Sequence, residues 1–558
     1  MHRPLPREAK TVLALLAASL ALRLAFAAWA DVFQDEVLYW WQGREPGVGF
    51  SPQPPVVPLS ARGAALLLGD GTVALRLPSL AAGTLAIAVA YLLGRDMYGG
   101  PGGLWAAALV AACPLFVALG AVSTPDAPLL ALWLLAMWTA WRGANGGSLG
   151  WWLACGATVA LGLYTKYMMV LALPCGFLAL AATPRGRRLL RGWGPWLAAG
   201  VATVLFVPVF LAWNRANGWA AMRYHLSARH EWEFEWDVVG QYVAGHAGAL
   251  SPVLYVGALG ALVAAWRAWR RRGDWRGAWL LAFGAVPILF FLPPSVFTKH
   301  RMMRVQWDEM GYAVGAVGLG AMAAGAELST LSRRARRRLG AAALAVAVFL
   351  TGGLMSASFC PPLAVAAGTR PPTLKMLGWR ELAARVRREA ARWEDARGPF
   401  VAGESFVTAL CLAYHLDTRE GIYALPDHRN VYYGLFEQLR EWGVSQWHMR
   451  RDRGGQDAIY VHEYRLSEPI DESPPKHAAR SFQEVELVDV FEVAYRGEVV
   501  RRFGIYRCRG CRPLFADPPA LLRALTPPPR LPPRRPGGRP GPAPSHTPRS
   551  SPAPGPRP

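Results

Sequence analysis

The sequence predicts a mainly α-helical protein that crosses a membrane many times and carries a small α/β domain after its last span. Two observations predict this class. Hydrophobic residues make up 53% of the 558 positions, and apolar runs close to the ~20 residues needed to cross a bilayer recur through the first two-thirds of the chain. The rest of the chain is mixed in polarity, as in a water-soluble domain.

The apolar runs correspond to eleven predicted spans. They lie at about 11–29, 73–94, 103–123, 126–141, 150–164, 167–182, 194–213, 250–266, 277–294, 309–326 and 339–357. The first run lacks a small-residue cleavage site, so we expect it to be retained as a span and not removed as a signal peptide.

Arginine collects in every second connection between these spans. With the basic segment 1–10 inside, the cytoplasmic connections hold the clusters at 185–191, 267–276 and 333–338. The positive-inside rule then places the opposite, mostly acidic or mixed connections outside the cell. The net charge of +22 reflects this topology and attraction to the anionic leaflet of the lipid bilayer, and not a nucleic-acid partner. We therefore expect a multi-pass protein of the cell (inner) membrane.

Three regions are predicted: a membrane domain over 1–358, an extracytoplasmic α/β domain over 359–515, and a disordered tail over 516–558. In the second region, strands are expected at 399–401, 458–461, 484–493 and 499–506, and helices at 378–393 and 431–442. The tail is mostly Pro, Gly, Ser and Arg and has little to bury.

Four cysteines belong to the predicted extracytoplasmic domain: Cys360, Cys411, Cys508 and Cys511. The last two have CxxC spacing, but no second pair or His cluster completes a zinc site. A disulfide or free thiols are therefore favoured over a metal site.

The first predicted outer connection, residues 31–62, carries an adjacent acidic pair. Asp35 and Glu36 precede Tyr39 and two tryptophans. Aromatic side chains lie at headgroup depth, so a carboxylate beside them suits chemistry on a polar group carried by a lipid. The alternative is an interfacial helix whose acids face water.

Two further outer connections hold single charged residues that could meet the first over one cavity. Asp126 opens the fourth predicted span, where the alternative is a helix start with Thr124 as N-cap and Asp126 in the first turn. Lys166, followed by Tyr167, is a cation on the outer side against the positive-inside bias. It suits binding of an anion, and the alternative is snorkelling to headgroups.

The fifth outer connection is basic on the side where basic residues are rare. It contains Lys299, His300, Arg301, Arg304 and Trp307. A cationic cluster beside a membrane is what a lipid phosphate requires. The sequence has no Walker loop, dinucleotide fingerprint or HExxH motif, so nothing points to nucleotide or metalloprotease chemistry.

A series of short motifs resembles glycosyltransferase family 39, membrane enzymes of the GT-C fold that include protein O-mannosyltransferases and aminoarabinose transferases of lipid A. The motifs run in order through most of residues 1–315. They are Asp35-Glu36-x-x-Tyr39-Trp40, Pro54-Pro55-Val56, Arg76-Leu77-Pro78-Ser79, Gly94-Arg95-x-x-Tyr98-Gly99, Thr124-Pro125-Asp126-Ala127-Pro128, Lys166-Tyr167, Trp213-Asn214 with Gly218-Trp219, and Trp307 with Gly311-Tyr312.

The resemblance implies a GT-C fold and a polyprenyl-phosphate sugar donor used on the outer face, with a lipid, glycan or protein acceptor. Asp35 would be the catalytic carboxylate, with Glu36 beside it. Family members commonly have His or Lys before the Pro-Pro pair, where this chain has Gln53. Phosphate contact is then expected from Lys166, Lys299, His300, Arg301 and Arg304, and contact with substrate or a metal from Asp126, Tyr39, Tyr167 and Trp307.

This set of residues fits an inverting transfer. A carboxylate can take the proton of the acceptor hydroxyl, whose oxygen attacks the anomeric carbon and expels polyprenyl phosphate. Cations can stabilise that anionic leaving group without a general acid, unlike the paired carboxylates of glycoside hydrolysis. No cofactor is predicted with certainty, and a divalent cation at Asp35 or Asp126 stays open.

Two other classes compete with this hypothesis. A multi-spanning lipid or sugar transporter or flippase would place charges and helix breaks near the membrane midplane, often in repeated halves, whereas here the polar residues gather outside. An envelope assembly protein working through its outer domain is the second alternative.

Overall fold

The computed structural model describes residues 7–45, 47–50, 53–223, 225, 234–297, 305–326, 328, 331–359, 372–393, 398–425, 445–467, 470, 474–495 and 497–513. Several predicted features lie outside these residues: Lys299, His300, Arg301, Arg304, Cys360, the helix at 431–442 and the tail over 516–558. The described residues, all of which lie between 7 and 513, belong to one compact unit.

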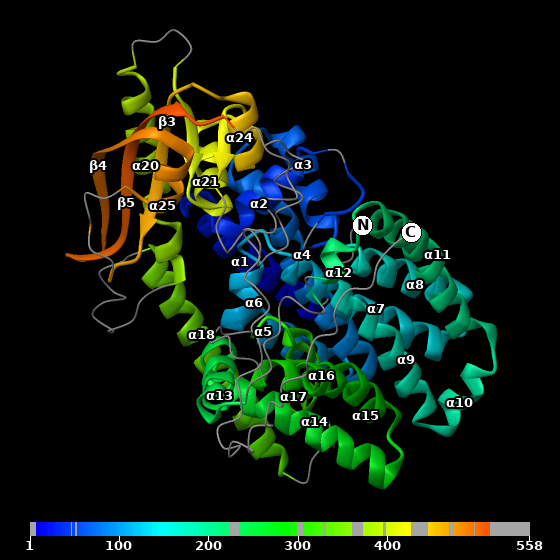
Figure 1. Cartoon of the computed structure of the whole chain (residues 1–558). Helices are drawn as coiled ribbons and strands as arrows, with labels where there is room; N and C mark the ends of the chain where they lie inside the picture. Colours follow the sequence, from blue (N-terminus) through cyan, green and yellow to red (C-terminus); the bar gives the residue numbers. More distant parts are fainter. Residues whose placement is uncertain are drawn as a thin grey trace, which may run out of the picture. The chain divides into compact units, whose positions relative to one another are not determined.

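The first part of this unit is a set of helices joined mainly by short turns (Figure 1). In chain order they are α1 (Arg7–Trp29), α2 (Gln34–Gln42), α3 (Val56–Leu68), α4 (Thr72–Tyr98), α5 (Gly100–Ala112), α6 (Pro114–Leu119), α7 (Asp126–Gly146), α8 (Leu149–Leu163), η1 (Tyr167–Leu171), α9 (Ala172–Ala181), α10 (Pro184–Leu190), α11 (Trp193–Ala216), α12 (Ala220–Arg223), α13 (Trp236–Leu250), α14 (Pro252–Arg272), α15 (Trp275–Leu280), η3 (Leu281–Ala285), α16 (Val286–Val296), α17 (Glu309–Ala324) and α18 (Arg333–Phe359).

Within the described part of the chain, six helical segments are long and apolar enough to cross a membrane. They are α1, α4, α11, α14, Trp275–Val296 and Arg333–Ser356. The mainly α-helical, polytopic class predicted from the sequence is therefore confirmed. The count of eleven spans stays a prediction.

Some expected spans are divided in the structure. The run expected at 103–123 is α5 followed by α6, with a break at Cys113, whose ψ is 122°. Pro114 explains the break, because the residue before a proline is disfavoured in the helical region. The run expected at 167–182 begins as the 3₁₀-helix η1 and continues as α9.

Small residues let the helices approach closely. A Cβ added to Gly320 of α17 would lie 2.6 Å from the backbone nitrogen of Ala106 in α5. Because no side chain fits in that space, these two helix backbones pack directly on each other, as is common between membrane helices. This contact fixes α17, whose first turn borders the candidate site.

The C-terminal domain, residues 372–513, contains one mixed five-stranded sheet. Its strands are β1 (Phe400–Gly403), β2 (Ile422–Ala424), β3 (Ala458–Tyr464), β4 (Phe482–Tyr495) and β5 (Glu498–Cys511), in the order β2-β1-β3-β5-β4. β1 is parallel to β2 and β3, whereas β5 is antiparallel to β3 and β4. The helical elements are η4 (Pro372–Met376), α20 (Trp379–Ala390), α21 (Phe406–Leu416), α24 (Gln446–Asp452) and α25 (Lys476–Ser481).

Each of the four segments expected as strands overlaps a strand, and the helix expected at 378–393 is α20. The domain boundaries at 358 and 515 stay predictions. The thiols of Cys411, Cys508 and Cys511 are buried and free.

The first connection and the C-terminal domain share a hydrophobic core. Trp40 and Trp41 of α2 belong to the same buried cluster as Trp379 of α20 and Leu410 of α21. The ring of Trp40 also meets the ring of Tyr414 edge-on, with centroids 5.3 Å apart. This packing holds α2 between the membrane helices and the sheet-bearing domain (Figure 1).

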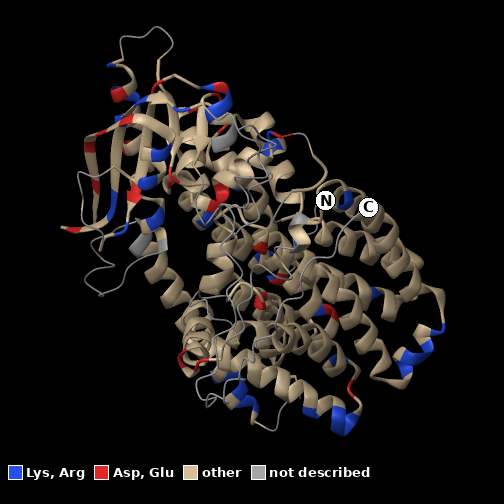
Figure 2. Cartoon of the chain, viewed as in Figure 1, with Lys and Arg blue, Asp and Glu red and all other residues tan. Residues whose placement is uncertain are grey.

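Charge is unevenly distributed over the unit. Figure 2 shows Lys and Arg on α10 and near the turn between α14 and α15, at the end of the helices away from the sheet. These are the connections that the arginine pattern assigned to one side of the membrane. Acidic residues also occur among the helices in the middle of the view, where the candidate site lies.

Candidate active site

The acidic pair Asp35-Glu36 lies in the first turn of α2. The N-cap residue is Phe33, which has no side-chain oxygen, so the side chain of Glu36 accepts the hydrogen bond from the Phe33 amide at 2.8 Å. Both carboxylates stand at the positive end of the helix dipole, which favours negative charge. Local sequence thus starts the helix and sets the pair at its beginning.

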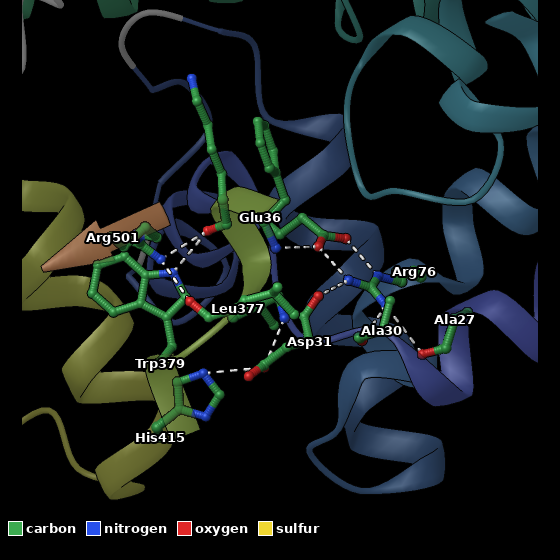
Figure 3. Close-up of polar contacts among 12 residues, drawn as sticks. Ala27, Ala30, Asp31, Glu36, Arg76, Leu377, Trp379, His415 and Arg501 are labelled. Carbon is green, nitrogen blue, oxygen red and sulfur yellow. Dashed lines mark hydrogen bonds and ion pairs between the residues drawn. The ribbon is translucent and has the colours of Figure 1, made fainter. Parts of the chain in front are cut away.

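Glu36 is the centre of a buried ion pair with Arg76 of α4. The Arg76 guanidinium donates to both Glu36 oxygens, at 2.8 and 2.7 Å, and neither side chain has exposed surface. It also donates to the carbonyls of Ala27, Ala30 and Asp31 at 2.7–3.1 Å (Figure 3).

A further hydrogen bond brings the turn before α7 to the same carboxylate. The backbone amide of Ser123 donates to Glu36 Oε1 at 2.7 Å. The end of α1, the start of α2, α4 and the turn before α7 therefore meet at Glu36. Because both of its oxygens accept hydrogen bonds, this carboxylate is suited to holding the first connection in place.

Asp35 has a different environment. No described residue donates a hydrogen bond to its carboxylate, and its side chain keeps accessible surface although protein atoms surround it. Burial and the negative charge of Asp126 raise its pKa from 3.8 to about 6, Glu36 raises it further, and Lys375 acts in the opposite direction. A carboxylate with this pKa is ionised at neutral pH and basic enough to accept a proton.

Asp126 and Lys166 form a second buried pair next to Asp35. Lys166 Nζ donates to Asp126 Oδ1 at 2.6 Å and to the carbonyl oxygen of Gln306 at 3.2 Å. The N-cap of α7 is Pro125, and the Thr124 hydroxyl has no partner among the described residues, so the alternative role of Thr124 as N-cap is wrong. Asp126 is in the first turn of α7, as expected.

The aromatic residues expected at the site are placed as follows. Tyr39 lies on α2 and is buried. Tyr167 follows Lys166 and contacts the rings of Phe206 and Phe210. Trp307 is buried and follows Gln306, whose carbonyl contacts Lys166.

The structure therefore brings together Asp35, Glu36, Asp126 and Lys166 from three connections. The four cations expected at 299–304 lie outside the described residues, so their role stays a prediction.

The C-terminal domain supplies a residue that sequence reasoning missed. The carbonyl oxygen of Lys375 accepts hydrogen bonds from Trp379 Nε1 and from the Arg501 guanidinium, both at 3.1 Å (Figure 3). Arg501 is itself fixed by Glu463 at 2.9 Å. These bonds anchor η4, and the Lys375 charge acts on Asp35. No motif surrounds Lys375, so the sequence offered no signal for it.

A contact between Asp31 and His415 also ties the first connection to this domain. Their side chains lie 3.2 Å apart (Figure 3). Burial acts to raise the pKa of Asp31, but His415 and the Val32 amide hold it below its usual value. Asp31 is therefore ionised and acts as an anchor close to Asp35.

A third buried pair, also missed, lies at the start of α17. Asp308 Oδ1 is 2.8 Å from His246 Nε2, and Asp308 Oδ2 accepts from the Tyr242 hydroxyl at 2.6 Å. The other ring nitrogen of His246 lies 2.8 Å from the Tyr242 carbonyl oxygen, so it carries a proton. A histidine and an acidic pair in or beside apolar runs were the signal that could have found this cluster.

Among the described residues, no three His, Cys, Asp or Glu side chains come together as metal ligands. A divalent cation at Asp35 or Asp126 stays a prediction.

Known proteins resemble this chain in both sequence and structure. A profile of the family described as dolichyl-phosphate-mannose-protein mannosyltransferase matches residues 52–213. The lipid A galacturonosyltransferase RgtD of Rhizobium johnstonii is 23% identical over 295 residues, which are 51% of this chain and 59% of RgtD. The chain therefore matches less than two-thirds of that relative's length.

Crystal structures of ArnT from Cupriavidus metallidurans share the fold. The apo form has a TM-score of 0.56 and the form bound to undecaprenyl phosphate a TM-score of 0.57. In each comparison the identity is 16%, and the match covers 88% of this chain and 97% of ArnT.

Proposed function

We propose that this chain, a GT-C membrane protein similar to glycosyltransferase family 39, transfers a sugar from a polyprenyl-phosphate donor to an acceptor hydroxyl. The proposal places the reaction at the outer face of the cytoplasmic membrane. One observation carries it: Asp35 is an accessible carboxylate whose pKa is raised to about 6 by burial and by the charge of Asp126. The cation Lys375 acts on Asp35 directly, and the cation Lys166 is paired with Asp126.

In this proposal Asp35 is the general base. It takes the proton of the acceptor hydroxyl, whose oxygen attacks the anomeric carbon of the donor. The bond from that carbon to the phosphate oxygen breaks, both of its electrons leave with polyprenyl phosphate, and the anomeric configuration inverts. A positioned base of this kind contributes roughly 10²–10⁴-fold to a rate.

The cations are assigned to the leaving group. Lys166 is held at the site by hydrogen bonds to Asp126 and to the Gln306 carbonyl. A donor phosphate would replace Asp126 as the acceptor of a hydrogen bond from Lys166 Nζ. Lys375 adds a second positive charge from the C-terminal domain. Negative charge grows on the phosphate as the bond breaks, so fixed cations stabilise the transition state more than the ground state.

Glu36 is assigned a positioning role beside the base. Its oxygens are engaged by Arg76, Phe33 and Ser123, so the carboxylate holds α2 against α4 and the turn before α7. This keeps Asp35 in one orientation. The name of RgtD, a lipid A glycosyltransferase, supports a lipid as acceptor, with a glycan or protein as the alternatives.

The outer-face orientation rests on two features. The arginines of α10 and of the α14–α15 turn lie away from the sheet (Figure 2), and cytoplasmic connections carry the excess of arginine. The site, next to the sheet-bearing domain, is then extracytoplasmic. The enzyme is favoured over a transporter or flippase because the relatives are glycosyltransferases.

The proposal is tested by transfer of radiolabelled sugar from polyprenyl-phosphate donors to membrane acceptors by the purified full chain. Asp35→Asn should lower the rate by at least ~100-fold. Asp70→Asn is the matched control, because Asp70 is also an exposed carboxylate but is paired with Arg44, and this variant should keep the wild-type rate. Unchanged transfer by a folded Asp35→Asn protein would remove Asp35 from the role of base.

A further inference from the structure

A cavity of about 390 Å³ lies among α7, α8, α9, α10, α11 and the α15–η3 segment. Its wall includes Trp152 of α8, Leu173 of α9 and Phe283 of η3, and none of the described side chains that line it carries a charge or a hydroxyl group. Protein interiors are densely packed and leave few voids of this size. Water needs polar partners to fill such a space. The cavity therefore suits an apolar occupant.

The cavity opens to the surface of the helical region. Phe177 and Trp196, which line it, are 51% and 55% exposed. Trp196 belongs to α11, a candidate span of which only 17% of the apolar window is buried inside the protein. In a bilayer, the surface of a span that protein does not cover meets lipid chains. An acyl chain of a neighbouring lipid can therefore enter the cavity from the membrane.

The free space reaches the backbone of α9. Gly176 lines the cavity, and a Cβ added to it would have one neighbour within 4 Å, the ring of Phe283 at 4.0 Å. A larger side chain at this position would therefore occupy the cavity without a clash at its Cβ.

Two free arginines mark one end of the cavity. Leu190, the last residue of α10, lines it, and Trp196 Nε1 donates to the Leu190 carbonyl at 2.8 Å, which holds α10 against α11. Arg188 and Arg191 lie on either side of Leu190 in the sequence, are exposed, and have no partner among the described residues. Figure 2 shows the basic residues gathered on α10. An apolar cavity that ends at two unpaired guanidinium groups is complementary to a lipid with an anionic phosphate headgroup.

We propose that this cavity binds an acyl chain of an anionic phospholipid, while Arg188 and Arg191 hold its phosphate. The bound lipid belongs to the leaflet that α10 faces. It is distinct from the polyprenyl-phosphate donor, because Lys166 directly precedes η1 and α9 whereas the two arginines follow them. The inference does not depend on the proposed function.

The test uses the full chain in nanodiscs of phosphatidylcholine that contain a trace of a photoactivatable lipid. The probe is phosphatidylglycerol, or phosphatidylcholine, with a diazirine at the end of the same acyl chain, and peptide mass spectrometry locates the crosslinks. In wild type, phosphatidylglycerol should label α9 and the first turns of α11 at least ~5-fold more strongly than phosphatidylcholine does.

Gly176→Leu should lower the labelling of these segments by at least ~5-fold, because the leucine occupies the space of the acyl chain. Gly260→Leu is the matched control. Gly260 lies on α14, where an added Cβ has no neighbour within 4 Å, and it does not line the cavity. This variant should keep the wild-type labelling.

The arginines are tested by the double variant Arg188→Gln with Arg191→Gln, which should reduce the labelling by phosphatidylglycerol to the level of phosphatidylcholine. Arg267→Gln with Arg271→Gln is its matched control, because both are exposed arginines of α14. That control should keep the wild-type preference, which separates a local headgroup site from general attraction by positive charge.

Three outcomes overturn the inference. They are equal labelling of α9 and α11 by the two probes in wild type, unchanged labelling in a folded Gly176→Leu protein, or displacement of the label by polyprenyl phosphate more effectively than by unlabelled phosphatidylglycerol. The last result would assign the cavity to the chain of the donor. The measurements on wild type decide even when a variant does not fold.

Discussion

The pH dependence of transfer follows directly from the environment of Asp35. Burial and the Asp126 charge raise its pKa from 3.8 to about 6, and a general base works only when deprotonated. The rate should therefore rise with pH up to about 6 and then level off. At pH 5 a base of pKa 6 is ionised in roughly one molecule in ten, whereas an unperturbed aspartate would be about nine-tenths ionised.

The part of the pH–rate profile in which the rate rises is its acidic limb. Variants of the groups that act on Asp35 should move this limb in opposite directions. Asp126→Asn removes a negative charge, so the pKa of Asp35 falls and the limb moves to lower pH. Lys375→Met removes a positive charge, so the limb moves to higher pH. Glu36, the remaining charge acting on Asp35, is left unchanged with its partner Arg76.

The assay is kcat/KM for sugar transfer between pH 4.5 and 8.5, with protein integrity checked at each pH. Absolute rates of the two variants will also change, so the limb position is the informative quantity. A limb near pH 4 in wild type, or shifts of the same sign in both variants, would contradict the assignment of Asp35 as a base with a raised pKa.

Three further predictions concern stability and binding. Arg76→Met should destabilise the protein by about 3–5 kcal/mol, because it leaves Glu36 charged and buried, and the double variant with Glu36→Gln should unfold at a higher temperature than Arg76→Met alone. Lys166→Ala should weaken the binding of polyprenyl phosphate by at least ~10-fold, whereas Lys166→Arg should keep part of the wild-type affinity because it keeps the positive charge. If a binding titration gave Lys166→Ala the same affinity as wild type, Lys166 would not belong to the phosphate site. The folded state holds Asp35 at a raised pKa, so the free energy of unfolding of wild type falls as pH rises from 3.8 through about 6. Asp35→Asn does not have this loss. It should therefore be more stable than wild type at pH 7.5, by up to about 1 kcal/mol after solvent screening. That difference should disappear below about pH 4 in thermal unfolding scans.

Hydropathy and charge predicted the class of fold because burial in a bilayer leaves a strong signal in composition. They did not predict where helices break. The division at Cys113 depends on the single residue Pro114, which a sliding apolar window passes over. The run predicted at 150–164 was placed more accurately, because helix α8 covers Leu149–Leu163.

The candidate site was only partly predictable. Asp35, Asp126 and Lys166 could be named because each is a charge in an otherwise apolar setting on one predicted side. Their partners depend on tertiary contacts: Arg76 meets Glu36 across 40 residues, and Lys375 reaches the site from another domain. The sequence does not indicate which of two adjacent acids, such as Asp35 and Glu36, is paired with a cation, because the two residues have the same flanking sequence.

The distribution of partners separates structural from chemical carboxylates at this site. Four carboxylates have a positive or potentially positive partner within 3.2 Å: Asp31 with His415, Glu36 with Arg76, Asp126 with Lys166, and Asp308 with His246. Among the described acids around the site, Asp35 and Glu309 lack such a partner. Asp35 is adjacent in sequence to the paired Glu36, and Glu309 is adjacent to the paired Asp308. A paired carboxylate cannot easily take a proton or a ligand, because its cation would then be left buried alone. Asp35 has no such partner and keeps accessible surface for an incoming hydroxyl, whereas Glu309 is fully enclosed by protein.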